Sequence, residues 1–139
     1  MIRVGTSGYS FDDWKGLIYP RRLQGSALPL YAKLFDCVEI NTTFYRVPPP
    51  RLFDRMLDSV ADDFVFLVKV PKEMTHQRDR FEHVVVPFAA SVVPLIRAGQ
   101  LGGLLVQFPF SFKPEPSSFA HLERIADALG GHGVPVHVE

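Results

Sequence analysis

Apolar and polar positions along the chain follow two periods that alternate from one end to the other. Runs that are apolar at nearly every position are typical of strands buried on both faces of a parallel sheet. Segments whose apolar residues recur every three or four positions predict helices. The predicted strands are IRVGTSG (2–8), CVEINTTFY (37–45), FVFLVKV (64–70), LLVQFP (104–109) and VPVHVE (134–139). The predicted helices cover residues 28–35, 52–60, 87–98 and, from a cap at Ser117 or Ser118, the stretch to Leu129.

Proline and glycine set the expected ends of these elements. The run PPP (48–50) should stop the second strand, because proline has no N–H for the ladder. Pro87 suits the first helical position, and Pro94 is expected to kink or break the same helix. Glycines are expected to end the last two helices: Gly99, Gly102 and Gly103 for one, Gly130 and Gly131 for the other.

Strands alternating with helices predict a parallel sheet with crossover helices. The connections from strand to helix are long and carry most of the reactive side chains, which marks that end of the sheet as functional. These side chains are Tyr9, Asp12, Trp14, Lys72, His76, Arg78 and Arg80.

Polar residues near the strand ends favour a barrel over an open doubly wound sheet. With a period of two, Glu39 and Asn41 share one face of their strand. Later strands also carry polar groups near their C-terminal ends: Lys69, Gln107, His137 and Glu139. A barrel would bring these ends together around one axis. We therefore predict an α/β fold, a parallel (β/α) barrel with about five strands and four helices.

Composition narrows the class of protein. The chain has 139 residues, 47% of them hydrophobic, which suits a single domain over 1–139 with a real core. Its formal net charge of +0 argues against a protein that coats DNA. Cys37 is expected to be a small buried hydrophobe. No signal peptide and no run of roughly 18 apolar residues is visible, so we expect a cytoplasmic protein without membrane contact.

Five separated motifs together resemble those of the DUF72 family, also called YecE-like proteins. The motifs are, in order, GTSGY (5–9), VEINTTFY (38–45), KVPKEMTH (69–76), QFPFSF (107–112) and VHVE (136–139). The resemblance implies a TIM-type barrel without an established activity. Tyr9 stands where the family more often has tryptophan, and Phe110 stands where it has a second proline.

The resemblance also implies that the chain is the N-terminal part of a domain, truncated at its C-terminus. The family's chain continues beyond VHVE, and a TIM-type barrel takes eight strands and about 250 residues. A partial barrel would leave two sheet edges open. We therefore expect poor solubility or an oligomer formed through these edges.

Charged residues among the strand ends are the candidate catalytic groups. Glu39 could act as a general base, with Lys69 binding an anion, or the two could form a purely structural ion pair. Glu139 is the best second carboxylate. The candidate ligand-binding residues are Tyr9, Asn41, Tyr45, His76 and Gln107.

The other motifs give weaker indications of function. His76 with Lys72, Arg78 and Arg80 would make a basic lip able to hold phosphate, or a solvated loop. Tyr9, Trp14, Phe44 and Tyr45 could stack on a sugar or base, or simply pack. No HxH or HExxH spacing occurs, so no metal site is predicted, and no cofactor can be named. GTSG lacks the patterns of a phosphate loop or a nucleophile elbow.

Three functions remain open on this reasoning, and whether the chain is an enzyme is undecided. The first is an enzyme that acts on a small polar or phosphorylated ligand at the C-terminal mouth of the barrel. The second is a nucleic-acid-binding or nuclease-like barrel, which the net charge does not support. The third is a non-catalytic partial barrel that needs a partner chain.

Overall fold

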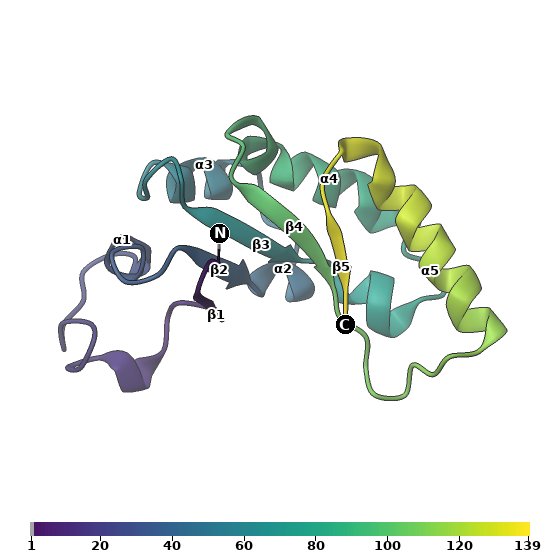
Figure 1. Cartoon of the computed structure of the whole chain (residues 1–139), viewed down its shortest axis with the longest axis horizontal. Helices are drawn as coiled ribbons and strands as arrows, with labels where there is room; N and C mark the ends of the chain where they lie inside the picture. Colours follow the sequence, from purple (N-terminus) through teal and green to yellow (C-terminus); the bar gives the residue numbers. More distant parts are fainter. Residues whose placement is uncertain (1) are drawn as a thin grey trace.

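The computed structural model describes residues 2–139. Its strands form one parallel sheet in the order β1-β2-β3-β4-β5 (Figure 1). The strands are β1 (Gly5–Ser7), β2 (Cys37–Ile40), β3 (Val65–Lys69), β4 (Leu101–Val106) and β5 (Val136–Val138). The α-helices are α1 (Leu28–Tyr31), α2 (Thr42–Tyr45), α3 (Arg51–Leu57), α4 (Glu82–Arg97) and α5 (Pro116–Leu129). Short helical turns are η1 (Asp12–Trp14), η2 (Glu73–Gln77, a π-helix) and η3 (Gly130–His132).

The strand order decides between the two α/β architectures. A doubly wound sheet reverses its strand order part-way and places helices on both faces. Here every strand lies beside the one that precedes it in the chain, and α3, α4 and α5 lie along one side of the sheet (Figure 1). This is the arrangement of successive β/α units in a barrel.

Burial alternates along the strands and separates an outer from an inner face. The residues that point toward the helices, such as Val38, Phe66 and Val106, are 0% exposed. Their neighbours Glu39, Leu67 and Lys69 point the other way and are only half-buried. The helices therefore cover the outer face, and the inner face stays open to solvent.

An aromatic cluster fixes the first strand against the second. The Tyr31 ring stacks on Phe35 at 4.7 Å between centroids, and Trp14 stacks on the same two rings. The Tyr31 hydroxyl accepts a hydrogen bond from the Thr6 N–H at 2.7 Å and donates one to the Cys37 carbonyl at 3.0 Å. Trp14 is thus a packing residue here, and Cys37 is buried as expected.

The second strand is shorter than its sequence predicts. The β-branched and aromatic run after Asn41 indicated a strand as far as Tyr45, but residues Thr42–Tyr45 form α2. The Thr43 hydroxyl explains the turn, because its Oγ1 lies within hydrogen-bonding distance of the carbonyls of Ile40 (3.1 Å) and Lys69 (2.6 Å). Tertiary contacts thus override the local preference for extended backbone. The first helix is also shorter than predicted and ends at Tyr31.

The prediction for the third helix was wrong about its first residue and about a break at Pro94. α4 begins at Glu82 rather than Pro87, and it runs without a break past Pro94 to Arg97. Each proline removes one backbone donor, but Phe88 and Leu95 are 0% exposed and hold the helix in the core. Packing of an apolar face is the main source of helix stability in proteins, so the helix persists.

Glycine and serine positions also differ from the prediction. Gly99 ends α4 with φ +68°, but Gly102 and Gly103 lie inside β4, where a Cβ would meet the side chains of Val65 and His137. They permit close packing rather than ending a helix. The last helix is preceded by Glu115 as its N-cap and starts at Pro116, so Ser117 and Ser118 lie in its first turn.

Candidate functional site

Polar side chains from the ends of β1 and β2 form one hydrogen-bonded group on the inner face. The Ser7 hydroxyl donates to Glu39 Oε1 at 2.8 Å. Asn41 Nδ2 donates to the same Ser7 oxygen at 2.7 Å. Ser7 and Glu39 are directly paired in the register of the two strands, which brings their side chains together. Ser7 therefore holds the Glu39 carboxylate in a fixed position.

A second group joins the ends of β3, β4 and β5. Lys69 Nζ donates to Gln107 Oε1, and Gln107 Nε2 donates to Glu139 Oε2 at 3.0 Å. The strand register accounts for this chain of contacts, since Lys69 pairs with Leu105, two residues before Gln107. A cation, an amide and a carboxylate thus follow one another across three strands.

The ion pair between Glu39 and Lys69 does not form. Among the residues that the structure describes, ion pairs join Lys15 to Asp12 and Arg124 to Glu82 only. Glu39 pairs in register with Leu67, so Lys69 lies two residues further along its strand. Each charged group instead has a neutral partner, Ser7 for the carboxylate and Gln107 for the ammonium.

His76 and Lys69 both contact the Phe44 ring. Lys69 Nζ lies 4.7 Å from the centroid of the Phe44 ring, and the His76 ring meets the same phenyl ring edge-on at 5.0 Å. Partial burial, followed by the positive charges of Lys69 and Arg78, lowers the pKa of His76 below its usual value. The lowered pKa favours the neutral imidazole, whose Nδ1 lies 2.9 Å from the Thr75 hydroxyl.

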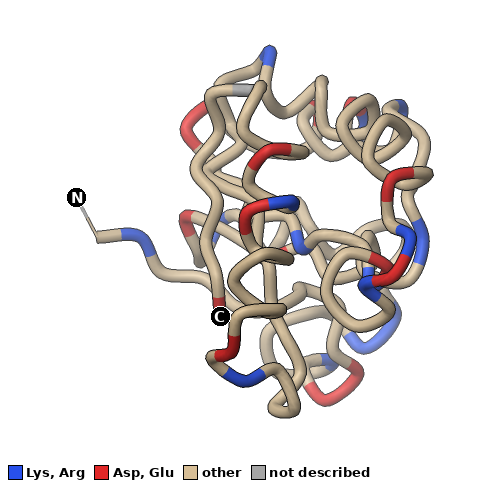
Figure 2. Tube along the Cα trace, turned by 90° about the vertical axis from the view of Figure 1, so that its right-hand side faces the viewer, with Lys and Arg blue, Asp and Glu red and all other residues tan. Residues whose placement is uncertain are grey.

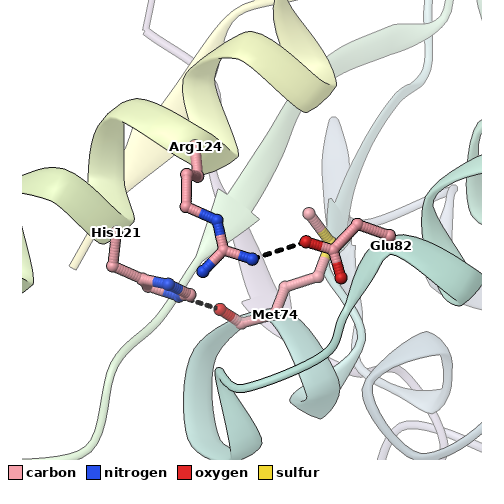
Figure 3. A network of polar contacts seen from close by, with 4 residues as sticks. All are labelled: Met74, Glu82, His121 and Arg124. Atoms are coloured by element: carbon pink, nitrogen blue, oxygen red, sulfur yellow. Dashed lines mark hydrogen bonds and ion pairs between the residues drawn. The ribbon is translucent and has the colours of Figure 1, made fainter.

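The segment that carries His76 is fastened to α5. His121 Nε2 donates to the Met74 carbonyl at 2.6 Å, and Arg124 Nη2 forms an ion pair with Glu82 Oε1 at 2.5 Å. Figure 3 shows both contacts. These contacts hold the π-helix η2 and the start of α4 against the last helix. The loop after β3 is thus a fixed wall of the site.

The expected basic lip forms only in part. A pocket of about 600 Å³ lies between η2 and α5, and His76 and Arg78 line it together with Arg124. Lys72 and Arg80 are not among its lining residues. Arg78 holds a left-handed backbone (φ 57°), and its guanidinium lies 5.4 Å from the centroid of the Phe112 ring.

A second pocket of about 630 Å³ opens at the ends of β1 and β2. Of the residues singled out in the sequence, Tyr9, Glu39 and Asn41 line it. Three basic residues that sequence reasoning missed line it too, namely Arg46, Arg51 and Arg55. The spacing of the last two was a usable signal, because residues four apart share one side of a helix. Ser7 was missed as a member of the site as well.

The remaining candidates lie near the site without completing it. Tyr45 is 73% exposed and contacts Phe44 edge-on at 5.0 Å, but it lines neither pocket. His137 is exposed at the end of the sheet. Within residues 2–139, no group of three or more His, Cys, Asp or Glu side chains could hold a metal ion.

Charge is mixed over the molecule. In Figure 2, basic and acidic positions are interspersed around the trace, and neither sign occupies a whole side.

Within the described part of the chain, no helix is both long and apolar enough to cross a membrane.

Comparison with known proteins shows the family. The model of the family described as "Protein of unknown function DUF72" matches residues 3–139. The chain belongs to the DUF72 family. The UPF0759 protein YecE of Escherichia coli K12 is 34% identical to it over 98% of this chain, and YunF of Bacillus subtilis is 28% identical over 94%. The match to DUF72 confirms the resemblance that the five motifs carry.

Solved DUF72 structures share the fold. A DUF72 protein from Thermotoga maritima superposes with a TM-score of 0.83 at 36% identity, covering 100% of this chain and 55% of its own. One from Enterococcus faecalis gives a TM-score of 0.84 at 26% identity, covering 99% of this chain and 50% of its own. With the strand order above, the fold is a partial (β/α) barrel of TIM type.

The chain spans about half the length of the relatives it matches, 48% of YecE and 48% of YunF. The inner face that is open here is the face that a whole barrel encloses.

Proposed function

We propose that the ends of the five strands form a binding site for a small polar or phosphorylated ligand, and that this site serves an enzyme. The observation that carries the proposal is that two hydrogen-bonded groups lie at the strand ends on the open face, Ser7 with Glu39 and Lys69 with Gln107 and Glu139. Polar groups at the C-terminal ends of barrel strands are the usual position of an active site in this architecture. They lie in two networks that fix their orientation before any ligand arrives.

The chemistry of these groups suits proton transfer beside a negative charge. Within the described residues, only Oε1 of Glu39 has a protein donor, so Oε2 can accept a proton or a hydrogen bond from a ligand. Lys69 supplies a positive charge that would stabilise an anion. Gln107 holds the ammonium in place, and Glu139 supports Gln107.

A partial barrel that requires a partner chain is a second proposal. It draws support from the half-buried inner face and from β1 and β5, each of which has one neighbour in the sheet. In that case the partner would supply the missing strands and complete the site. Nucleic-acid binding draws less support, because the signs of charge are mixed and the net charge is +0.

Binding titrations with matched variants test the first proposal. The full chain would be titrated by calorimetry with sugars, nucleosides and their phosphate esters. We expect Glu39→Gln and Lys69→Ala each to weaken binding of the best ligand by about tenfold or more, since each removes a charge-assisted hydrogen bond. Asp62→Asn and Lys33→Ala remove the same charges at exposed positions that precede β3 and β2, away from their C-terminal ends, and serve as controls.

The proposal fails if both site variants bind as the wild-type chain does. It also fails if the controls weaken binding equally, because charge in general would then be the cause.

A further inference from the structure

We propose that Arg46, Arg51 and Arg55 form a phosphate-binding subsite in the pocket beside Glu39. The ligand class is a phosphate monoester attached to a ring, such as a phosphosugar or a nucleoside monophosphate. This inference rests on the function proposed above and names the part of the ligand that the arginines would hold.

The three arginines reach one pocket from two segments of the chain. Arg51 and Arg55 lie one turn apart on α3, and Arg55 Nε donates to the Arg51 carbonyl at 3.4 Å. Arg46 follows α2 directly and lines the same pocket of about 630 Å³. A cavity of this size lies within the range of about 300–1,000 Å³ that small-molecule sites occupy.

Their positive charge is not neutralised by the protein. The ion pairs among the described residues involve other side chains, and Glu39 is the single carboxylate in the pocket lining. Glu39 already accepts from Ser7. Three guanidinium groups against one carboxylate leave the pocket with a net positive charge that an anion would balance.

The chemistry of arginine selects phosphate among small anions. The guanidinium presents its N–H groups in a planar fork that matches two oxygens of a phosphate. A monoester carries between one and two negative charges near pH 7, since its second pKa is about 6. Several guanidinium groups around one pocket therefore fit a phosphate group better than a single carboxylate.

The other walls indicate what the phosphate is attached to. Rings and apolar side chains line the pocket from both sides, with Tyr9 and Phe11 from the loop after β1 and Pro48, Pro49 and Leu52 from the segment after β2. Such walls can contact the face of a sugar or base. Glu39 and Asn41 lie in the same lining and can bind hydroxyl or amino groups of that ring.

The test compares two double variants of the full chain. Glucose 6-phosphate and adenosine monophosphate would be titrated by calorimetry, each beside its unphosphorylated parent. We expect Arg51→Gln/Arg55→Gln to weaken binding of the phosphorylated ligand by at least about tenfold. The control, Arg22→Gln/Arg97→Gln, removes two exposed arginines that line neither pocket and should stay within about twofold of wild type.

All four arginines are exposed, so we expect both double variants to fold. Thermal melting followed by circular dichroism measures this. Preference for one phosphorylated ligand over the other would tell a sugar from a nucleoside as the ring. Equal binding of the phosphorylated ligands and their parents would overturn the subsite, as would unchanged binding in Arg51→Gln/Arg55→Gln.

The two proposals fail in different ways. If Glu39→Gln and Lys69→Ala weaken binding but the arginine variant does not, the subsite is wrong and the proposed function stands. If only the arginine variant weakens binding, the subsite stands and the role given to the strand ends is wrong. If no ligand of the panel binds the wild-type chain, both are wrong.

Discussion

At the scale of single residues, Lys69 connects most of the candidate site. It donates to Gln107 and lies over the Phe44 ring, which His76 also contacts. Its placement follows from the strand alternation, because Phe66 and Val68 occupy the buried face of β3. The same alternation predicted which face Glu39 and Gln107 would occupy.

The contact partners of the strand residues were harder to predict than the face of the sheet on which each residue lies. The sequence left open an ion pair between Glu39 and Lys69, since buried charges need compensation. The register sets the two groups apart along adjacent strands, and the open inner face removes the need for an ion pair. Register depends on contacts between distant segments, so it cannot be read from local sequence. The arginines of the pocket were not predicted, because they lie after α2 and on α3 rather than at the strand ends.

The first prediction concerns the coupling of His76 to Lys69. Burial is the largest cause of the lowered pKa of His76, and the charge of Lys69 is the next. Lys69→Met should therefore raise the pKa of His76 part of the way toward its usual value. Titration of the His76 ring resonances by NMR measures this directly.

Lys72→Met is the matched control, because Lys72 does not contribute to the shift of His76. An unchanged or lower pKa of His76 in Lys69→Met would contradict the influence of the Lys69 charge on His76. The lowered pKa also makes the free energy of unfolding depend on pH. The contribution of His76 to stability is fully present above the usual histidine pKa and is lost as the pH falls through the lowered pKa of the folded chain.

At the scale of elements, the alternation of strands and helices was predictable, and the exact ends were not. All five strands lie within or overlap the predicted runs. Apolar runs mark the central strands, which the helices bury, whereas β1 and β5 are mostly exposed. α2 was missed because a run of Thr, Phe and Tyr favours strands locally, whereas the Thr43 hydroxyl binds two carbonyls of its neighbours. α4 continues through Pro87 and Pro94 because its apolar face is buried.

The second prediction concerns the close approach of β1 and β2. A Cβ built on Gly5 would collide with the backbone carbonyl of Cys37, which cannot move without disturbing the sheet. Gly5→Ala should therefore lower the free energy of unfolding by about 1–3 kcal/mol. Urea denaturation followed by circular dichroism provides the measurement.

Gly130→Ala is the control for the same change of residue. Among the described residues, a Cβ at Gly130 would meet nothing within 4 Å beyond its chain neighbours and the backbone of its own helix. The backbone there has φ −67°, so alanine should be neutral or stabilising by up to about 1 kcal/mol. Equal stabilities of the two variants would show that β1 does not approach β2 as described.

At the scale of the whole molecule, the chain is an open part of a barrel. The helices bury the outer face, while inner-face residues such as Leu67 and Leu105 remain half-exposed. The strands β1 and β5 each present one unpaired edge, and exposed edges pair readily with other chains. The motifs of the sequence pointed to this state through the family they resemble.

The third prediction follows from these edges. The mass of the purified chain, measured by light scattering after size-exclusion chromatography, should rise with concentration. Val138→Lys should reduce this association, because it places a charge on the edge strand β5, where Val138 is 58% exposed. Val86→Lys on α4, at a position 74% exposed, should leave it unchanged. A sharp monomer peak with a cooperative melting transition would contradict the prediction.

The most direct test of the central claim is the affinity of Glu39→Gln for a phosphorylated ring ligand, measured by calorimetry beside Asp62→Asn. If the strand ends hold the ligand, the first variant binds about tenfold more weakly or worse and the second binds as the wild-type chain does. Equal affinities in the two variants would show that the ligand binds elsewhere.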